Sequence, residues 1–500
     1  KEPWSRTSSV GSGVRSCAQM PTAVVWQASR EIRRGSVIAE GSCQHPRPSA
    51  TAELSAELSK AQQEAYETFA GIRDRRSYVM RNMAGLRSIF YHPFSVFLLA
   101  LPLGVTASRL GWDPNWVFWL NFFALIPLAK ILGDATEELD ACLHNEVISG
   151  LLNATFGNAV EMIITVQTLR AGLVNVVKAT LLGSVLSNML LVLGMSFFFG
   201  GIIELGGGKA ANGFLTPMDV SFTESQIGAR QPLLDNVSEE PRGVHLVAEK
   251  EQVFIVNSAL VSVTMLLVSC LGFALPTIFS QAFGEEETVL AMSRTAAGIV
   301  GLSYFAYLAF QLITHRNMLA NSSEDDDADD DDDEDGEGLT VGVAIGLLAL
   351  TTVFTSLSSD CLVDVIEAVV ENSGISECFI GIILLPIVGN ACEHVAAVRF
   401  AVQNKPGLSI SIAVGSAVQV SLFVVPFAVL MGWAIGQPMN LDFGILNTTV
   451  LVICVLVVMS IVVDGRSNWL EGYMLCSSYA LIAVMYWHVK SFNAIEGDEL

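Results

Sequence analysis

Charge is scarce in this sequence. Only 15% of its 500 residues are Asp, Glu, Lys or Arg, whereas 52% are apolar, and the mean hydropathy is +0.51. Soluble globular domains normally carry about 25% charged residues, so this composition excludes an ordinary soluble protein. None of the nine cysteines forms a CxxC pair, and most lie in apolar runs, where a free thiol behaves as a small hydrophobe. We therefore expect neither a disulfide framework nor a zinc site.

The charge that is present is unevenly distributed. Residues 1–87 hold 13 Lys and Arg against 8 Asp and Glu, whereas residues 324–337 are acidic at every position except Ala328 and Gly336. The net charge of −23 argues against nucleic acid as a partner. Residues 1–50 contain no apolar core of signal-peptide length, and apolar residues spaced by three and four over 54–72 predict one amphipathic helix.

Long apolar runs make up most of the remaining chain. A helix crosses the hydrocarbon core of a bilayer with about 20 mostly apolar residues, and about eleven such stretches occur. They span approximately residues 89–109, 115–133, 147–169, 178–202, 252–280, 289–312, 338–357, 377–400, 407–433, 444–463 and 469–490. The sequence therefore predicts an all-α polytopic membrane protein that sits in a lipid bilayer.

Basic residues near the ends of these stretches predict the orientation. Five arginines between residues 73 and 87 precede the first stretch and place the N-terminus in the cytosol. Eleven spans then put the C-terminus on the other side. The predicted organisation is a cytosolic N-terminal region (1–87), a first membrane half (88–312) with a loop insertion (209–250), an acidic cytosolic linker (313–337), a second membrane half (338–490) and a C-terminal tail (491–500).

The two membrane halves carry an internal repeat. Residues 157–161 read GNAVE and residues 389–393 read GNACE, an offset of 232 residues (389 − 157). The pairs Gly183-Ser184 and Gly415-Ser416 keep the same offset, which indicates duplication. One extra N-terminal helix followed by two repeats of five helices accounts for eleven spans. An odd number of crossings inverts the second repeat, and inverted repeats are typical of secondary transporters. No TVGYG-like segment supports a channel.

Two glutamates are the main candidates for a transport site. Glu161 and Glu393 lie within apolar stretches, where an ionised carboxylate is costly unless a proton or a cation neutralises it. A hard divalent cation requires six or more oxygen ligands. Further candidates around the glutamates are Asn158, Asn390, Ser184, Ser187, Ser416, Gln419, Gly157, Gly389 and His394.

Several of these residues also fit a purely structural interpretation. Asn and small residues commonly pack membrane helices together, and His394, next to Glu393, serves as a proton relay or simply as a packing residue. Pro386 is expected to break the eighth stretch and free backbone carbonyls. Acidic residues flank both halves, at Asp134, Glu137 and Glu138 and at Asp360, Asp364, Glu367 and Glu371. They form either solvated helix faces or vestibules that attract cations.

At these residues the sequence resembles the calcium/proton exchanger (CAX) family of the calcium/cation antiporter superfamily. The segments that carry the resemblance are GDATEELDACLHNEVISGLLNATFGNAVEMII, ILLPIVGNACEHVAAV, LSSDCLVDVIEAVVENSGISECFIG, MSRTAAGIVGLSYFAYLAFQL and DGRSNWLEGYML. The resemblance covers approximately residues 90–489. It implies a transporter rather than an enzyme, with no resident cofactor, that moves Ca²⁺ out of the cytosol into an acidic organelle such as a vacuole in exchange for H⁺. Glu161 and Glu393 would be the shared carboxylates that bind Ca²⁺ or H⁺.

The resemblance leaves other functions open. One is a Na⁺-coupled or Mn²⁺-preferring exchanger on the same fold. From other classes, a passive channel or a calcium-binding protein without transport activity would also use acidic residues. The family often has an acidic stretch between its halves, where residues 324–337 lie, and some members have a regulatory N-terminal region, which makes residues 1–87 a candidate for autoinhibition. The resemblance does not account for the 209–250 insertion, and the sequence does not specify an oligomeric state.

Overall fold

The computed structural model describes residues 78–143, 148, 152, 155–205, 251–314 and 338–489. All of them belong to one unit, residues 78–500. The predictions for residues 1–77, including the amphipathic helix at 54–72, lie outside the described residues. So do those for the 209–250 insertion, the acidic tract at 324–337 and the tail at 491–500.

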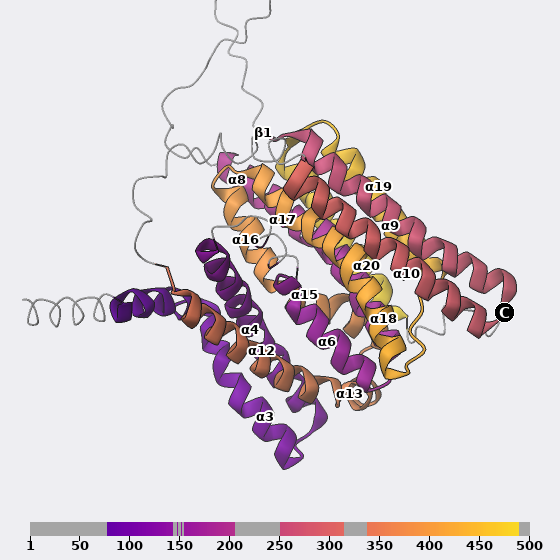
Figure 1. Ribbon diagram of the computed structural model, residues 1–500, viewed down its shortest axis with the longest axis horizontal. Helices are drawn as coiled ribbons and strands as arrows, with labels where there is room; N and C mark the ends of the chain where they lie inside the picture. Colours follow the sequence, from indigo (N-terminus) through magenta and orange to yellow (C-terminus); the bar gives the residue numbers. More distant parts are fainter. Residues whose placement is uncertain are drawn as a thin grey trace, which may run out of the picture. The chain divides into compact units, whose positions relative to one another are not determined.

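Helices dominate the described part of the chain, which confirms the all-α fold class (Figure 1). After a helix at residues 78–90, the first half contains η1 (Pro93–Leu99), α3 (Ala100–Leu110), α4 (Pro114–Cys142), α6 (Ala159–Arg170), α7 (Val174–Leu186), η2 (Ser187–Val192), α8 (Leu193–Leu205), α9 (Val256–Phe283), α10 (Glu286–Ala309) and η3 (Phe310–Thr314). The second half contains α12 (Val341–Val363), α13 (Ile366–Ser373), α14 (Glu377–Phe379), η4 (Ile380–Leu384), α15 (Leu385–Gly389), α16 (Ala391–Val402), α17 (Pro406–Gln419), η5 (Val420–Val424), α18 (Val425–Ile435), α19 (Ile445–Val462) and α20 (Trp469–His488). Two short strands, β1 (Gln252–Val253) and β2 (Arg466–Ser467), pair antiparallel.

Eight of the described helical segments are long and apolar enough to cross a membrane. A ninth candidate consists of Glu377–Gly389 and Ala391–Val402, two helical pieces bent by 58°. The spans predicted at 147–169 and 469–490 correspond to α6 and α20, but neither helix meets the same criterion of length and hydropathy. The predicted count of about eleven spans is therefore not confirmed. For the span at 147–169 the reason is the turn at Gly157 and Asn158, which hydropathy along the sequence does not detect.

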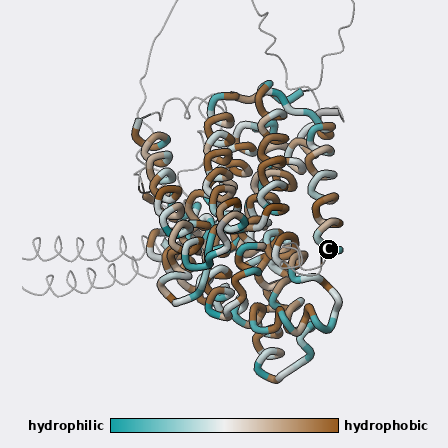
Figure 2. The backbone as a smooth tube through the Cα atoms, turned by 90° about the vertical axis from the view of Figure 1, so that its right-hand side faces the viewer, coloured by the Kyte–Doolittle hydropathy of each residue, from teal (hydrophilic) through white to brown (hydrophobic). Residues whose placement is uncertain are grey.

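Large apolar side chains cover much of the outer surface. Leu302 and Leu481 are 70% and 72% exposed, and hydrophobic residues colour most of the long helices while hydrophilic residues gather in the connections (Figure 2). Exposed apolar surface of this extent indicates contact with lipid rather than water. The surface composition therefore agrees with the membrane protein predicted from the sequence.

The ends of the bundle can be distinguished by their contacts. At one end, Arg81 donates a hydrogen bond to the Gly338 carbonyl (2.6 Å), and the Leu339 N–H donates to Glu138 (2.7 Å). Because the helices alternate in direction, β1 and β2 lie at this same end, which we call the β1–β2 end. The turns around Gly172 and Gly436, both with positive φ, lie at the opposite end, which we call the Gly172 end.

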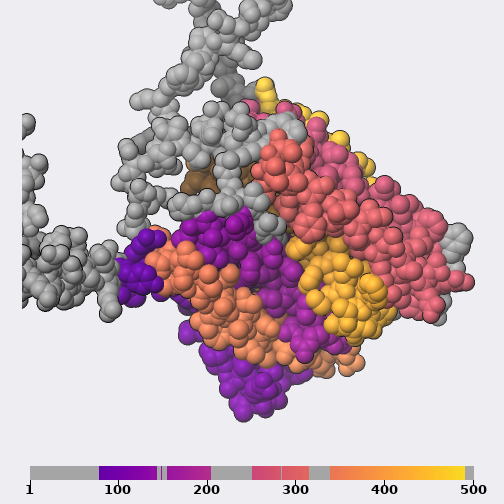
Figure 3. Space-filling model, in the orientation of Figure 1, coloured from indigo at the N-terminus to yellow at the C-terminus, as the bar shows by residue number. Residues whose placement is uncertain are grey.

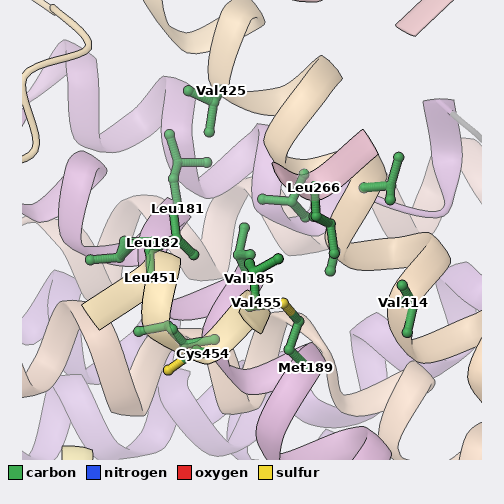
Figure 4. Packing of buried hydrophobic residues seen from close by; sticks show 14 of the residues in the cluster. Leu181, Leu182, Val185, Met189, Leu266, Val414, Val425, Leu451, Cys454 and Val455 are labelled. Carbon is green, nitrogen blue, oxygen red and sulfur yellow. The ribbon is translucent and has the colours of Figure 1, made fainter. Parts of the chain in front are cut away.

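The helices form two groups with the repeat motifs between them. One group contains α3, α4 and α12, and the other contains α9, α10, α18, α19 and α20, with α6, α15 and α16 between them (Figure 1). Figure 3 shows the surface that α4 and α12 share on the first group. The two repeats meet in a large apolar cluster, where Leu181, Val185 and Met189 of the first half pack with Val414 and Val455 of the second (Figure 4). This core links the two repeats.

The contact between α8 and α20 depends on two glycines. A Cβ placed on Gly472 would lie 2.6 Å from the Gly194 carbonyl oxygen and 2.7 Å from the Phe198 Cα. Both are backbone atoms, which cannot move aside as a flexible side chain can. Close backbone approach at small residues is a main source of packing energy between membrane helices.

We expect Gly472→Val to lower the free energy of unfolding by about 1–3 kcal/mol, the usual cost of overpacking. Thermal unfolding of the purified protein in detergent would measure the change. Gly298→Val is the matched control, because nothing lies within 4 Å of a Cβ at that exposed position. Equal stability of the two variants would show that the α8–α20 contact is not closely packed.

Candidate functional site

Both repeat motifs lie where a helix breaks. Gly157 and Asn158 form a turn directly before α6, and Asn390 separates α15 from α16. Glu161 and Glu393 consequently lie in the first turns of α6 and α16, where the helix dipole favours a negative charge. The second break was expected at Pro386, but Pro386 lies inside the helical segment and the turn comes at Asn390. Proline is tolerated there because it occupies the first turn of α15.

Hydrogen bonds join each motif to the opposite repeat. The Asn158 amide donates to Gln419 Oε1 (2.6 Å), and the Ser184 hydroxyl donates to Asn390 Oδ1 (2.9 Å). Asn390 Nδ2 also donates to the Ser184 carbonyl (3.3 Å). The predicted asparagines, Ser184 and Gln419 therefore meet at the interface between the repeats, as the duplicated sequence suggested.

Two short π-helical segments adjoin this interface at equivalent positions. η2 begins at Ser187, and η5 begins at Val420, directly after Gln419. π-helical turns inside α-helices are frequent at functional sites. Their pairing extends the internal symmetry beyond the residues that the sequence repeats.

Six buried oxygen atoms near the motifs have no hydrogen-bond partner among the described residues. They are Asn158 Oδ1, Glu161 Oε1, Glu161 Oε2, Ser187 Oγ, Asn188 Oδ1 and Glu393 Oε2. A buried oxygen without a partner is costly, whereas a hard cation requires about six to eight oxygen ligands. These oxygens are therefore of the chemical kinds that ligate a hard cation.

The carboxylates of the two motifs lie close to each other. Glu161 is only 2% exposed, and its Oε1 lies 2.8 Å from the place where a Cβ on Gly389 would be. Coulombic repulsion from Glu161 acts on Glu393, which lies one helical turn after Gly389. Neutralisation by a cation or by protons removes this repulsion.

A cavity of about 340 Å³ reaches the site. Its walls come from the C-terminal parts of α4 and α10, from η3, from the first turns of α16, and from the middle and C-terminal part of α17. Glu137, Gln311 and Ala396 line the part of the cavity that extends from the motifs toward the β1–β2 end. Five predicted residues line it, namely Gly157, Gly389, Glu393, Ser416 and Gln419. The other six, Asn158, Glu161, Ser184, Ser187, Asn390 and His394, lie behind this lining.

His394 makes a hydrogen bond within its own helix. Its Nδ1 lies 2.6 Å from the Asn390 carbonyl oxygen, and its Nε2 is buried without a partner among the described residues. Nδ1 therefore carries the hydrogen that the carbonyl accepts. The contact fixes the orientation of the ring. The role of His394 as a proton relay stays a prediction.

Asn188 belongs to the site but was missed by the sequence analysis. Its amide donates to the Ser416 hydroxyl (2.9 Å), and its Oδ1 is one of the six buried oxygens. Asn188 follows Ser184 by four residues, so both lie on one face of α7 and η2. An amide in an otherwise apolar run, one turn after the repeated serine, was the available signal.

The acidic residues near the membrane ends have different environments. Glu137 lines the cavity, whereas Asp134 pairs with Lys130 and Glu138 accepts a hydrogen bond from Leu339. Asp360, Asp364, Glu367 and Glu371 are all exposed. Desolvation, with the nearby Asp360 carboxylate as a second cause, raises the pKa of Asp364.

Carboxylates alone do not complete a metal site here. No group of three or more His, Cys, Asp or Glu side chains in the described ranges is arranged to hold a metal ion. A cation between the motifs would instead have two carboxylates supplemented by amide and hydroxyl oxygens. Such a mixed set holds a cation less permanently than a cage of carboxylates does, because fewer charges attract it.

Comparison with known proteins agrees with this geometry. A model of the sodium/calcium exchanger protein family matches residues 115–224 and 343–487. Vacuolar cation/proton exchanger 2 of Oryza sativa subsp. japonica is 36% identical over 393 residues, 77% of this chain and 80% of that protein. The Ca²⁺/H⁺ antiporter of Aphanothece halophytica is 34% identical over 404 residues, 79% and 95% of the two chains. The solved structure of native YfkE is 31% identical, covers 79% of this chain and 99% of its own, and superposes with a TM-score of 0.60.

The fold and the paired motifs define a membrane transporter of the cation antiporter class. More narrowly, the chain belongs to the calcium/proton exchanger (CAX) family of the calcium/cation antiporter superfamily.

Proposed function

We propose that this protein exchanges cytosolic Ca²⁺ for protons from an acidic compartment by alternating access. The observation that carries the proposal is the pair of buried glutamates in the two motifs, together with unpartnered amide and hydroxyl oxygens in and beside those motifs. Ca²⁺ is the cargo that best fits such a set, because it accepts carboxylate, amide and hydroxyl oxygens together. The relatives named for Ca²⁺/H⁺ or cation/proton exchange support this choice.

Charge balance accounts for the exchange. Two ionised carboxylates neutralise one Ca²⁺, and two protons neutralise the same pair. The occupied site is therefore nearly neutral in either state, which lowers the cost of enclosing it in the apolar interior while access changes sides. Ca²⁺ and protons compete for Glu161 and Glu393, because a protonated carboxylate is a poor cation ligand. The two fluxes are therefore coupled without direct contact between the ions.

The cavity indicates the side of the membrane from which the cation enters the site. With the N-terminus in the cytosol, the β1–β2 end faces the cytosol, and the cavity leads from that side to Glu393. Glu137 stands in the same cavity, where a negative charge raises the local cation concentration. This favours the vestibule interpretation for Glu137, and we propose a vacuole or a similar acidic organelle as the location, in accord with the vacuolar relatives.

The test is ⁴⁵Ca²⁺ uptake into sealed vesicles that contain the purified protein and are acidic inside. We expect uptake to exceed that of protein-free vesicles at least tenfold and to collapse when a protonophore dissipates the pH gradient, because protons drive the exchange. Vesicles with an outward Na⁺ gradient and equal pH on both sides are the control for the coupling ion, and competition by Mn²⁺ reports on cargo. Uptake that follows the Na⁺ gradient and ignores the protonophore would contradict the proposal.

A further inference from the structure

Two glycines bring α7 against η4. A Cβ on Gly183 of α7 would lie 2.6 Å from the Ile382 Cα and 2.7 Å from its carbonyl carbon, and it would overlap the carbonyl oxygen. One turn away, a Cβ on Gly381 of η4 would overlap the Cβ of Ala179. The obstacle to a side chain at position 183 is the backbone of Ile382, so the helices could accept one only by moving apart.

Pro386 accounts for the π-helical form of η4 beside α7. Pro386 follows Ile382 by four residues and has no N–H, so the carbonyl lacks the donor that a regular α-helix would supply. The segment Ile380–Leu384 accordingly forms a π-helical turn. Glycine at 183 lets the backbone of α7 approach the backbone of this turn at Ile382.

The repeat provides an internal comparison. Gly415 of α17 is the counterpart of Gly183 at the offset of 232 residues. It lines the cavity, and nothing lies within 4 Å of a Cβ at that position. The same glycine therefore makes a tight contact in one repeat and faces open space in the other.

The tight contact lies on the far side of the site from the cavity. α7 runs from Val174 at the Gly172 end toward Ser184, and Val176 and Ile380 belong to an apolar cluster with Phe118, Leu362 and Leu385. This cluster packs the space between the glutamates and the Gly172 end. The structure thus combines a cavity toward the β1–β2 end with close packing toward the Gly172 end.

We propose that the contact between α7 and η4, made by Gly183 on Ile382 and by Gly381 on Ala179, holds the transport pathway closed at the Gly172 end. Separation of α7 from η4 is the step that opens this end. The inference rests on the alternating access of the proposed function and names the residues on which the closure depends.

Thiol labelling tests the closure without measuring transport. Thr180→Cys places a thiol beside the contact, where the native residue is 4% exposed. Ile412→Cys, its counterpart at the same offset, places one in the cavity. Each is introduced into a protein whose nine native cysteines have been replaced, and the rate of reaction with a hydrophilic maleimide is measured in detergent.

Gly183→Ala and Gly381→Ala should each raise the labelling rate at position 180 relative to that at position 412 by about fivefold or more, the population shift expected from overpacking. Gly298→Ala is the control, because that position is exposed with nothing within 4 Å of a Cβ, and it should leave the ratio unchanged. The double variant Ala179→Gly/Gly381→Ala moves one methyl group from one side of the contact to the other. The Cβ at 381 then lies 3.5 Å from the Val176 carbonyl oxygen, an ordinary van der Waals distance. We expect it to restore the ratio of the parent protein.

Equal ratios for Gly183→Ala and Gly298→Ala would overturn the proposal. So would a double variant that labels like Gly381→Ala alone. Should Gly183→Ala fail to fold, the comparison between Gly381→Ala and the double variant decides the question. A shifted ratio together with uptake that ignores the pH gradient would support the closure and contradict only the proposed coupling ion, so the two proposals fail separately.

Discussion

Glu161→Gln and Glu393→Gln should each reduce Ca²⁺/H⁺ exchange at least about 100-fold. Glutamine keeps the shape of the side chain but removes one of the two charges that balance the divalent cation. At an effective dielectric constant of about 20, one pair of unit charges about 4 Å apart contributes roughly 4 kcal/mol, enough to account for such a loss. The measurement is proton-driven ⁴⁵Ca²⁺ uptake at matched protein levels.

Glu371→Gln is the control for this experiment, because Glu371 is exposed at the surface and does not line the cavity. It should transport at the parent rate. The two site variants should fold normally, since a neutral amide costs less to bury than a carboxylate, and thermal unfolding would show this. Near-normal exchange by either site variant would contradict the paired-carboxylate mechanism.

The sequence predicted the parts of this site that the duplication repeats. Glu161, Glu393 and the two asparagines follow from the offset of 232 residues, and an inverted repeat places equivalent residues on opposite sides of one interface. The hydrogen bonds from Asn158 to Gln419 and from Ser184 to Asn390 cross this interface. Whether these residues bind Ca²⁺ stays a prediction that the glutamine variants test.

The features that were missed depend on three-dimensional packing. Asn188 has no polar counterpart, because the residue 232 positions later is Val420, so the repeat could not identify it. Pro386 was expected to break its helix, but the break occurs at Asn390, where the two halves bend by 58°. A proline in the sequence shows only that one backbone hydrogen bond of the helix is missing. The position of the bend depends in addition on the packing of the neighbouring helices.

Gly389→Ala should raise the Ca²⁺ concentration required for half-maximal uptake about tenfold or more. The new Cβ would lie 2.8 Å from Glu161 Oε1 and 3.3 Å from its Cδ. The obstacle is the end of a flexible side chain, so the carboxylate moves aside and the helix is preserved. A ligand displaced by about 1 Å no longer meets the cation in its preferred geometry, and functional sites lose most of their performance at displacements of this size.

Gly407→Ala separates this effect from the general cost of replacing glycine in a membrane helix. Gly407 lies in the first turn of α17, and nothing is within 4 Å of a Cβ there. Uptake by that variant should match the parent protein, and both alanine variants should unfold at temperatures close to the parent value. A Gly389→Ala variant with unchanged Ca²⁺ dependence would mean that the position of the Glu161 carboxylate beside Gly389 does not control cation binding. In that case Glu393 and the cavity, rather than the pair of glutamates, would hold the transported ion.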